Sequence, residues 1–205
     1  MPTAGPALSV GVSSVPGMDV VYRTATSADG FIADAENSLE WLFEVPGADG
    51  DPEAMAGFLD DVGALVMGRT TYEWVLDHER LLEHPEKWHA CYGERPTWVF
   101  SHRELPPIPG VDLRFVAGAV SDHHEAVAAG AAGRDVWLLG GGDLVGQYAD
   151  AGLLDRIVLD LTPVFLGAGA PLLPRRMTST RVRLQEVTRE GQRVRVDYRV
   201  GDPSS

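Results

Sequence analysis

The sequence contains a single cysteine, Cys91, among its 205 residues. One cysteine excludes an internal disulfide and any metal site built from several cysteines, and it favours a reducing, cytoplasmic compartment. We interpret Cys91 itself as a structural or idle thiol rather than a nucleophile, because structural thiols are usually inert.

Basic residues are scarce as well, since 17 Lys and Arg stand against 30 Asp and Glu and give a net charge of −13. This balance argues against a nucleic acid partner, because contacts to phosphate backbones need a basic face. It does not exclude a small anionic ligand. A local pocket of arginines and helix N-termini can outweigh carboxylates that lie beyond a screening length of about 10 Å.

Long apolar stretches are missing too, because no run reaches the roughly 18 residues that a membrane-spanning helix needs. Residues 1–18 have neither a basic start nor a long apolar core, which argues against a signal peptide. They are rich in Pro, Gly, Ser and Ala, so we expect a disordered leader there. The remainder, residues 19–202, has the size of a single domain.

Several catalytic motifs are absent. There is no G-x-S-x-G turn, so a serine hydrolase is unsupported. His124-Glu125 lacks a second histidine at the spacing of a zincin. His84-Pro85-Glu86 is not accompanied by the P-C-x-x-C that a zinc deaminase requires. We therefore expect no metal site.

What the sequence does contain is an alternation of apolar strand-like runs and helical patterns, joined by short links. This alternation predicts an α/β fold with a central, mostly parallel, twisted sheet flanked by helices and closed by a C-terminal antiparallel β-hairpin. The expected strands are 20–27 (continuing at 31–33), 64–67, 97–100, 113–116, 136–139, 156–161, 181–187 and 193–200. The expected helices are 37–42, one opening at Pro52 after an Asp51 cap, 72–76, 121–132 with Ser121 and Glu125 as a capping box, and one ending near Ala151. The segment 77–88 reads as a surface connection, with a helical turn as the alternative.

Three polar motifs follow expected strands: Gly68-Arg69-Thr70-Thr71, Ser101-His102-Arg103 and Gly140-Gly141-Gly142. In open sheets of this kind, ligands bind beyond the carboxyl ends of the strands, where helix N-termini also favour phosphate. The three motifs therefore predict one shared anion-binding cleft. A dinucleotide-binding fingerprint is a weaker interpretation, because the third glycine, Gly146, comes one residue late and the unit lies late in the chain.

The ordered set of motifs resembles the dihydrofolate-reductase-like superfamily. It is most similar to stand-alone relatives of the reductase domain of the bacterial riboflavin-biosynthesis deaminase–reductase. The resemblance runs from about Val20 to Val200. It is carried by Ser27–Gly30, Met67–Tyr72, Ser101–Arg103, Leu139–Gly142, Leu154-Asp155, Leu159–Pro163 and Gly167–Leu172.

The resemblance implies NADPH as cofactor. Gly68, Arg69 and Thr70 would then bind the pyrophosphate through a helix N-terminus and a cation. Ser101 and Arg103 would hold the adenosine 2′-phosphate, which selects NADPH over NADH. Gly140, Gly141 and Gly142 would let the backbone approach the cofactor. The alternative is that Arg69 and Arg103 are ordinary surface arginines that bind no ligand.

On the substrate side, Asp29 is the first catalytic candidate, with a role as a plain Asp-Gly turn residue as its alternative. Glu53 or Asp51 lies near where folate reductases keep a substrate-binding acid. Both acids are explained equally well as charges at a helix N-terminus that complement the helix dipole. Riboflavin-pathway reductases tend to carry a basic residue after Asp-Gly, where this chain has Phe31. With Ser27, the aromatic residues Phe31 and Trp41 would form a substrate site with a flat apolar wall, unless the two rings pack in the core.

The resulting expectation is an NADPH-dependent reductase of a pyrimidine- or pteridine-like heterocycle, related to 5-amino-6-(5-phosphoribosylamino)uracil reductase of riboflavin biosynthesis. The alternatives are an activity of the dihydrofolate reductase type and a non-catalytic nucleotide-binding module that keeps the cofactor cleft. We expect a small-molecule substrate, no nucleic acid or membrane partner, and a homodimer.

Overall fold

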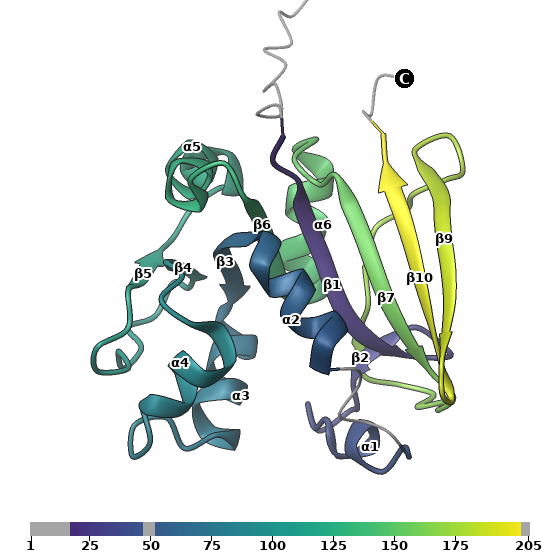
Figure 1. Ribbon diagram of the computed structural model, residues 1–205, viewed down its shortest axis with the longest axis horizontal. Helices are drawn as coiled ribbons and strands as arrows, with labels where there is room; N and C mark the ends of the chain where they lie inside the picture. The colour runs from purple at the N-terminus through teal and green to yellow at the C-terminus, as the bar shows by residue number, and fades with distance from the viewer. Residues whose placement is uncertain (1–16, 47–51, 202–205) are drawn as a thin grey trace, which may run out of the picture.

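The computed structural model describes residues 17–46 and 52–201. Their central element is an eight-stranded sheet with the order β5-β4-β3-β6-β1-β7-β10-β9 (Figure 1). Neighbouring strands from β5 to β7 pair in parallel, whereas β10 is antiparallel to β7 and to β9. The strands are β1 (Val20–Ser27), β3 (Val62–Gly68), β4 (Thr97–Phe100), β5 (Leu113–Val116), β6 (Asp135–Gly140), β7 (Arg156–Thr162), β9 (Val182–Glu190) and β10 (Arg193–Val200).

Helices cover both faces of this sheet. In Figure 1, α2 crosses in front of the middle strands and α6 lies behind them, while α1 and α3 lie beyond the carboxyl ends of β1 and β3. A second, two-stranded sheet pairs β2 (Phe31–Ala33) with β8 (Ala170–Pro171) at that same end. The helices are α1 (Glu40–Phe43), α2 (Pro52–Asp61), α3 (Arg69–His78), α4 (Glu86–Tyr92), α5 (Val120–Ala131) and α6 (Gly142–Asp150).

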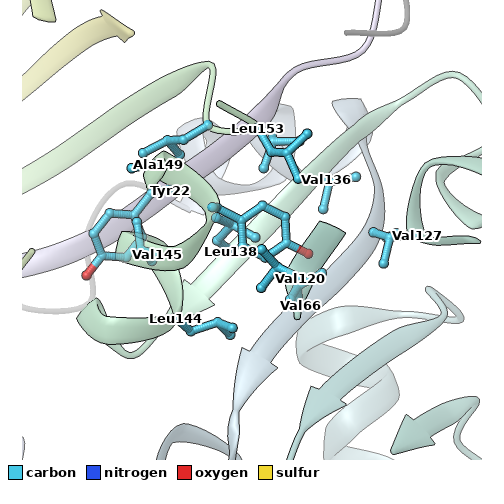
Figure 2. Packing of buried hydrophobic residues seen from close by; sticks show 14 of the residues in the cluster. Tyr22, Val66, Val120, Val127, Val136, Leu138, Leu144, Val145, Ala149 and Leu153 are labelled. Carbon is cyan, nitrogen blue, oxygen red and sulfur yellow. The ribbon is translucent and has the colours of Figure 1, made fainter. Parts of the chain in front are cut away.

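The larger core cluster lies between the sheet and helices α5 and α6. Figure 2 shows Tyr22, Val66 and Leu138 of the strands facing side chains of the two helices, with Val145 contributed by α6 and Val127 by α5. Those five side chains are at most 1% exposed. A second cluster on the opposite face packs α3 and α4 against β3 and β4. The sheet is therefore fixed from both sides, and its carboxyl edge is a rigid platform.

The mixed α/β architecture, the terminal hairpin and the predicted strands are confirmed, with strand boundaries that differ by at most three residues. Within the segment 77–88 the structure has the helical alternative, because α4 begins at Glu86. The surface placement is wrong at Trp88, which is buried in the second core cluster. The predicted cap at Ser121 is also wrong. The N-cap of α5 is Ala119, so Ser121 already lies within the helix.

The predicted disordered leader, residues 1–18, can be judged only at its end, because residues 1–16 lie outside the described residues. Met18 is 4% exposed and belongs to the larger core cluster. An apolar side chain buried to this extent is part of the fold, so the leader prediction is wrong at Met18. Asp51 likewise falls outside the described residues.

Candidate functional site

Three cavities lie side by side along the carboxyl ends of the parallel strands. The phosphate cavity, so named because the N-termini of two helices lie at it, has a volume of about 340 Å³ and lies beyond β3, β4 and β6. The central cavity, about 310 Å³, shares Thr70, Gly141 and Asp143 with it. The aromatic cavity, about 450 Å³, shares Trp74 and Leu139 with the central one. Together they form one continuous cleft.

Two helices begin at the phosphate cavity, and each has a glycine as its N-cap. Gly68 caps α3 and Gly141 caps α6, and both residues line the cavity. A glycine has no side chain to accept from the first N–H groups of its helix, so these donors stay available to a ligand. A Cβ on Gly68 would lie 3.6 Å from the nitrogen of Gly141, which shows how closely the two turns approach. Paired helix N-termini of this kind suit a pyrophosphate.

Side chains add charge and hydrogen-bonding groups around these termini. Arg69, Ser101 and His102 line the phosphate cavity, and of these His102 was not predicted. Arg69 donates to Glu73 at 2.7 Å within α3, and its partly exposed side chain lines the phosphate cavity. The Ser101 hydroxyl donates to the carbonyl of Arg103 at 2.8 Å and accepts from the Arg103 N–H at 3.0 Å. This turn fixes the backbone from which the Arg103 side chain projects.

One carboxylate, Asp143, also lines the phosphate cavity and would repel an anion. Arg175 offsets it, because its Nη2 donates to Asp143 at 3.1 Å while its Nε donates to Asp150 at 2.7 Å. The arginine crosses α6 at Gly146, where a Cβ would lie 2.9 Å from Arg175 Cγ. The segment around Arg175 therefore helps to keep the cavity receptive to anions.

The three glycines after β6 have different roles. Gly141 lines both the phosphate and the central cavity, and nothing lies within 4 Å of the place where its Cβ would be. Gly142 lines the central cavity, but its missing side chain leaves room for the carbonyl oxygens of Pro171 and Leu172. Gly140 has a φ of +129° and precedes a cis peptide bond to Gly141. Gly142 thus serves the packing of the β8 segment as well as the cleft.

The aromatic cavity has two indole rings in its wall, Trp74 of α3 and Trp137 of β6. Trp74 is stacked on His78 with ring centroids 4.4 Å apart. Trp137 donates from Nε1 to the carbonyl of Arg23 at 3.0 Å. Both rings are held by specific contacts, so they present fixed flat surfaces to a planar ligand.

The predicted aromatic pair has other surroundings. Phe31 pairs with Pro171 in the small sheet, and it is the next residue, Ile32, that lines the central and aromatic cavities. Trp41 is buried, 7% exposed, and absent from the lining of all three cavities. Trp41 therefore corresponds to the packing alternative, whereas Phe31 is partly exposed and belongs to neither core cluster. Sequence reasoning missed Trp74 and Trp137 because their neighbours along the chain read as an ordinary helix and a buried strand.

Ser27 and Asp29 form a turn rather than a pocket. The Ser27 hydroxyl donates to Asp29 Oδ1 at 2.6 Å and accepts from the N–H of Phe31 at 2.9 Å. Asp29 also accepts from the backbone N–H groups of Leu166 at 3.1 Å and Gly167 at 2.7 Å. The hydrogen bond from Ser27, assisted by those of Gly167 and Leu166, lowers the pKa of the Asp29 carboxyl. An ionised carboxylate with both oxygens engaged is a poor proton donor, which favours the turn role for Asp29.

We expect Asp29→Asn to lower the melting temperature at neutral pH and to have little effect in acid. The folded-state pKa of Asp29 lies below its unfolded value. Its stabilisation is therefore present above the unfolded pKa, about 3.9, and is lost as the pH falls through the folded pKa. Melting curves of both proteins from about pH 7 to pH 2 test this sign. Glu125→Gln, on the exposed side of α5, is the matched control. A difference that persists undiminished in acid would contradict the carboxylate's role in the turn.

Glu53, the second catalytic candidate, is exposed in the first turn of α2. It does not line any of the three cavities, although Met55 of the same helix borders the aromatic cavity.

Within residues 17–46 and 52–201, no group of three or more His, Cys, Asp or Glu side chains is placed to hold a metal ion. In the same ranges, no helix is long and apolar enough to cross a membrane.

Comparisons with known proteins agree with this geometry. The family model described as "RibD C-terminal domain" matches residues 74–196. The chain is 29% identical over 181 residues to the uncharacterized protein YwjB of Bacillus subtilis (strain 168). This match covers 87% of this chain and 95% of YwjB.

Solved structures show the same fold. A candidate riboflavin biosynthesis protein from Shewanella sp. PV-4 superposes with a TM-score of 0.72 at 24% identity, covering 89% of this chain and 99% of that one. Dihydrofolate reductase from Enterococcus faecalis, in complex with NADP(H) and an inhibitor named RAB-propyl, gives a TM-score of 0.57 at 17% identity. That match covers 91% of this chain and 98% of the reductase. The predicted dihydrofolate-reductase-like fold is confirmed.

Proposed function

Because the chain belongs to the RibD C-terminal domain family, we propose that it is an NADPH-dependent reductase of a pyrimidine- or pteridine-like heterocycle. The observation that supports this most is the pair of glycine-capped helix N-termini at the phosphate cavity, which opens through the central cavity into an aromatic-walled one. A dinucleotide needs the first two compartments, and a flat acceptor needs the third.

In this proposal, each group of residues has one task. The N–H groups that follow Gly68 and Gly141 bind the pyrophosphate with Arg69, and Ser101 and Arg103 bind the 2′-phosphate. NADPH supplies a hydride when it is bound. Trp74 and Trp137, whose flat rings line the aromatic cavity, orient the acceptor ring.

The leading candidate reaction is the reduction of 5-amino-6-(5-phosphoribosylamino)uracil or a close relative, which the family membership favours. An activity of the dihydrofolate reductase type is the enzymatic alternative, which is favoured by the apolar side chain of Phe31 after Asp-Gly and by the tryptophan walls. A nucleotide-binding module without turnover would keep the cofactor cleft, formed by the phosphate and central cavities, and would reduce no acceptor.

Two measurements separate these functions. NADPH binding is followed by the change in its fluorescence, and turnover by NADPH consumption with uracil, pterin and dihydrofolate substrates. We expect NADPH to bind and at least one heterocycle to be reduced. Tight binding without turnover on this panel would favour the non-catalytic module. If NADPH did not bind at all, the reductase proposal would be wrong.

We also propose that the protein forms a homodimer through β9, one of the two edge strands of the large sheet. Leu184 and Val187 of β9 are 58% and 55% exposed, and they pair with Tyr198 and Val196 of β10. An edge strand with apolar side chains is a natural surface for a twofold contact. Light scattering of the purified protein should give twice the monomer mass, and a monomer at all concentrations would refute the dimer.

A further inference from the structure

The last residue of α4, Tyr92, forms part of the wall of the aromatic cavity. It borders only this one of the three cavities, whereas Trp74 and Leu139 border the central cavity as well. Its ring packs against two indoles, with centroid distances of 4.7 Å to Trp88 and 6.1 Å to Trp137. Trp88 belongs to the second core cluster and Trp137 to the cavity wall. The phenol therefore lies at the boundary between the core and the cavity.

Arg95 fixes the backbone that carries this ring. Its Nη1 donates to the carbonyl of Tyr92 at 2.7 Å, and its Nε donates to the carbonyl of Val62 at 2.9 Å. Its Nη2 donates to the carbonyl of Leu59. One guanidinium thus ties the end of α4 to β3 and to α2. A side chain on a backbone held in this way loses little entropy when a ligand binds to it.

The hydroxyl of Tyr92 differs from those of three other tyrosines in the core. Tyr22 and Tyr72 each donate to a backbone carbonyl, at 3.1 Å and 2.6 Å. Tyr148 has no partner, but its oxygen is completely enclosed. In the described part of the chain, the hydroxyl of Tyr92 has no hydrogen bond, and its oxygen is not among the enclosed ones. An accessible hydroxyl without a partner, on a residue that lines a ligand cavity, is a hydrogen-bonding group for a ligand.

The phenol of Tyr92 is a donor rather than an anion at neutral pH. Burial is the main cause that raises its pKa, and the charges of Cys91 and Glu79 add to the shift. A phenol with a raised pKa keeps its proton, so it presents one O–H donor to a ligand.

The other polar side chains of the aromatic cavity are less suited to this role. The carboxylates Asp160 and Glu190 both accept hydrogen bonds from one arginine, at 2.8 Å and 3.0 Å. The hydroxyls of Thr24 and Thr71 belong to residues that also line the central cavity, where the cofactor is proposed to bind. Of these three hydroxyl-bearing residues, Tyr92 alone borders the aromatic cavity and not the central one.

We propose that Tyr92 is a substrate-binding residue whose hydroxyl donates a hydrogen bond to a ring carbonyl oxygen of the hydride acceptor. The proposal rests on the reductase function proposed above and makes it more specific. Uracils and oxopteridines both carry such a carbonyl. An amino group in the same place would itself donate and would leave the hydroxyl proton without an acceptor. The acceptor is therefore an oxo-substituted heterocycle rather than its amino analogue.

The test uses Tyr92→Phe and two fluorescent probes, lumazine (2,4-dioxopteridine) and 2,4-diaminopteridine. Lumazine contains the pyrimidine-2,4-dione ring of the uracils. Binding of each probe is measured by fluorescence titration of the full chain in the presence of NADP⁺. We expect Tyr92→Phe to weaken lumazine binding about 3- to 10-fold and to change the binding of the diamino compound by less than about twofold. Unchanged lumazine binding, or equal losses for the two probes, would overturn the proposal.

Tyr148→Phe is the matched control. It removes a hydroxyl that also has no partner and whose pKa is also raised by burial, but Tyr148 lines none of the three cavities. Both substitutions keep the aromatic ring and break no hydrogen bond, so we expect the same melting temperature and NADPH affinity in both variants. If Tyr148→Phe weakened lumazine binding as much as Tyr92→Phe does, the effect would come from the core and our proposal would be refuted.

NADPH binding separates a failure of this proposal from a failure of the reductase function. If NADPH did not bind to the unmodified protein, the reductase function would be contradicted. Normal NADPH binding together with no lumazine binding, or with lumazine binding that does not depend on the hydroxyl, would contradict only the role of Tyr92.

Discussion

Gly142→Ala is expected to destabilise the protein by about 3 kcal/mol and to weaken NADPH binding with it. A Cβ at this position would lie 2.3 Å from the carbonyl oxygen of Pro171 and 2.5 Å from that of Leu172. Both contacts are to backbone, so the β8 segment would have to move as a whole. Pro171 pairs with Phe31 and lines the central cavity, and the displacement would therefore reach the cleft. Chemical denaturation and NADPH fluorescence measure the two effects.

Two further glycines on helices serve as graded controls for this result. At Gly146 the nearest atoms belong to the side chain of Arg175, which can shift. Gly146→Ala should therefore lower the free energy of unfolding by clearly less than Gly142→Ala does. At Gly57 nothing lies within 4 Å, and Gly57→Ala should be neutral or stabilise α2 by up to about 1 kcal/mol. Similar losses for Gly142→Ala and Gly57→Ala would contradict the steric explanation.

Arg103→Ala should weaken NADPH binding by about 1.5–3 kcal/mol, roughly 10- to 150-fold, and leave NADH binding nearly unchanged. The turn between Ser101 and Arg103 uses only the backbone of Arg103, and the side chain of Arg103 is exposed. Arg103 does not itself line the phosphate cavity, but it directly follows Ser101 and His102, which do. NADH lacks the 2′-phosphate, so the loss of the Arg103 side chain removes no contact to it. Fluorescence titration with both cofactors measures the difference.

Arg69→Ala provides the comparison for Arg103→Ala. Arg69 lies beside the N-terminus of α3, where both cofactors would place their shared pyrophosphate. Removal of the Arg69 side chain should weaken the binding of NADPH and the binding of NADH to the same extent. If Arg103→Ala also affected both cofactors equally, its assignment to the 2′-phosphate would be wrong.

The elements that could be predicted from the sequence are those whose signal is local. The buried strand Ala64–Met67 and the glycine run after Leu139 are continuous in the chain, and both elements are found near their predicted places. The helix α4 was predicted only as an alternative helical turn, because its apolar signal is short and follows Pro85 in an acidic, histidine-bearing segment. The cap of α5 was misplaced because Ser121 and Glu125 only approximate a capping box, being four residues apart instead of three. The helix begins two residues earlier, with Ala119 as its N-cap and no side-chain cap.

The substrate side of the cleft could not be predicted because its residues are brought together by strand register. Arg23, Asp160 and Arg195 are far apart in the sequence, and each alone reads as a charge on an alternating strand. Phe31 and Trp41 were chosen for their closeness to the Asp-Gly turn, whereas the cavity wall is formed by Trp74 and Trp137. One signal was available in retrospect, namely the alternation of Arg193 and Arg195 with valines in β10, which places several charges on one face.

The position of β1 in the middle of the sheet has a consequence for how the protein is made. β1 is the first strand of the sheet to leave the ribosome, yet Val20 pairs with Val136 and Val21 with Arg156, more than 100 residues later. Pairings of such long range close slowly, because the loop entropy must be overcome before the contacts form. Until β6 and β7 have been synthesised, both edges of an apolar strand stay unpaired and open to intermolecular contacts. The yield of native protein should therefore depend on chaperone capacity and on synthesis rate more than its final stability suggests.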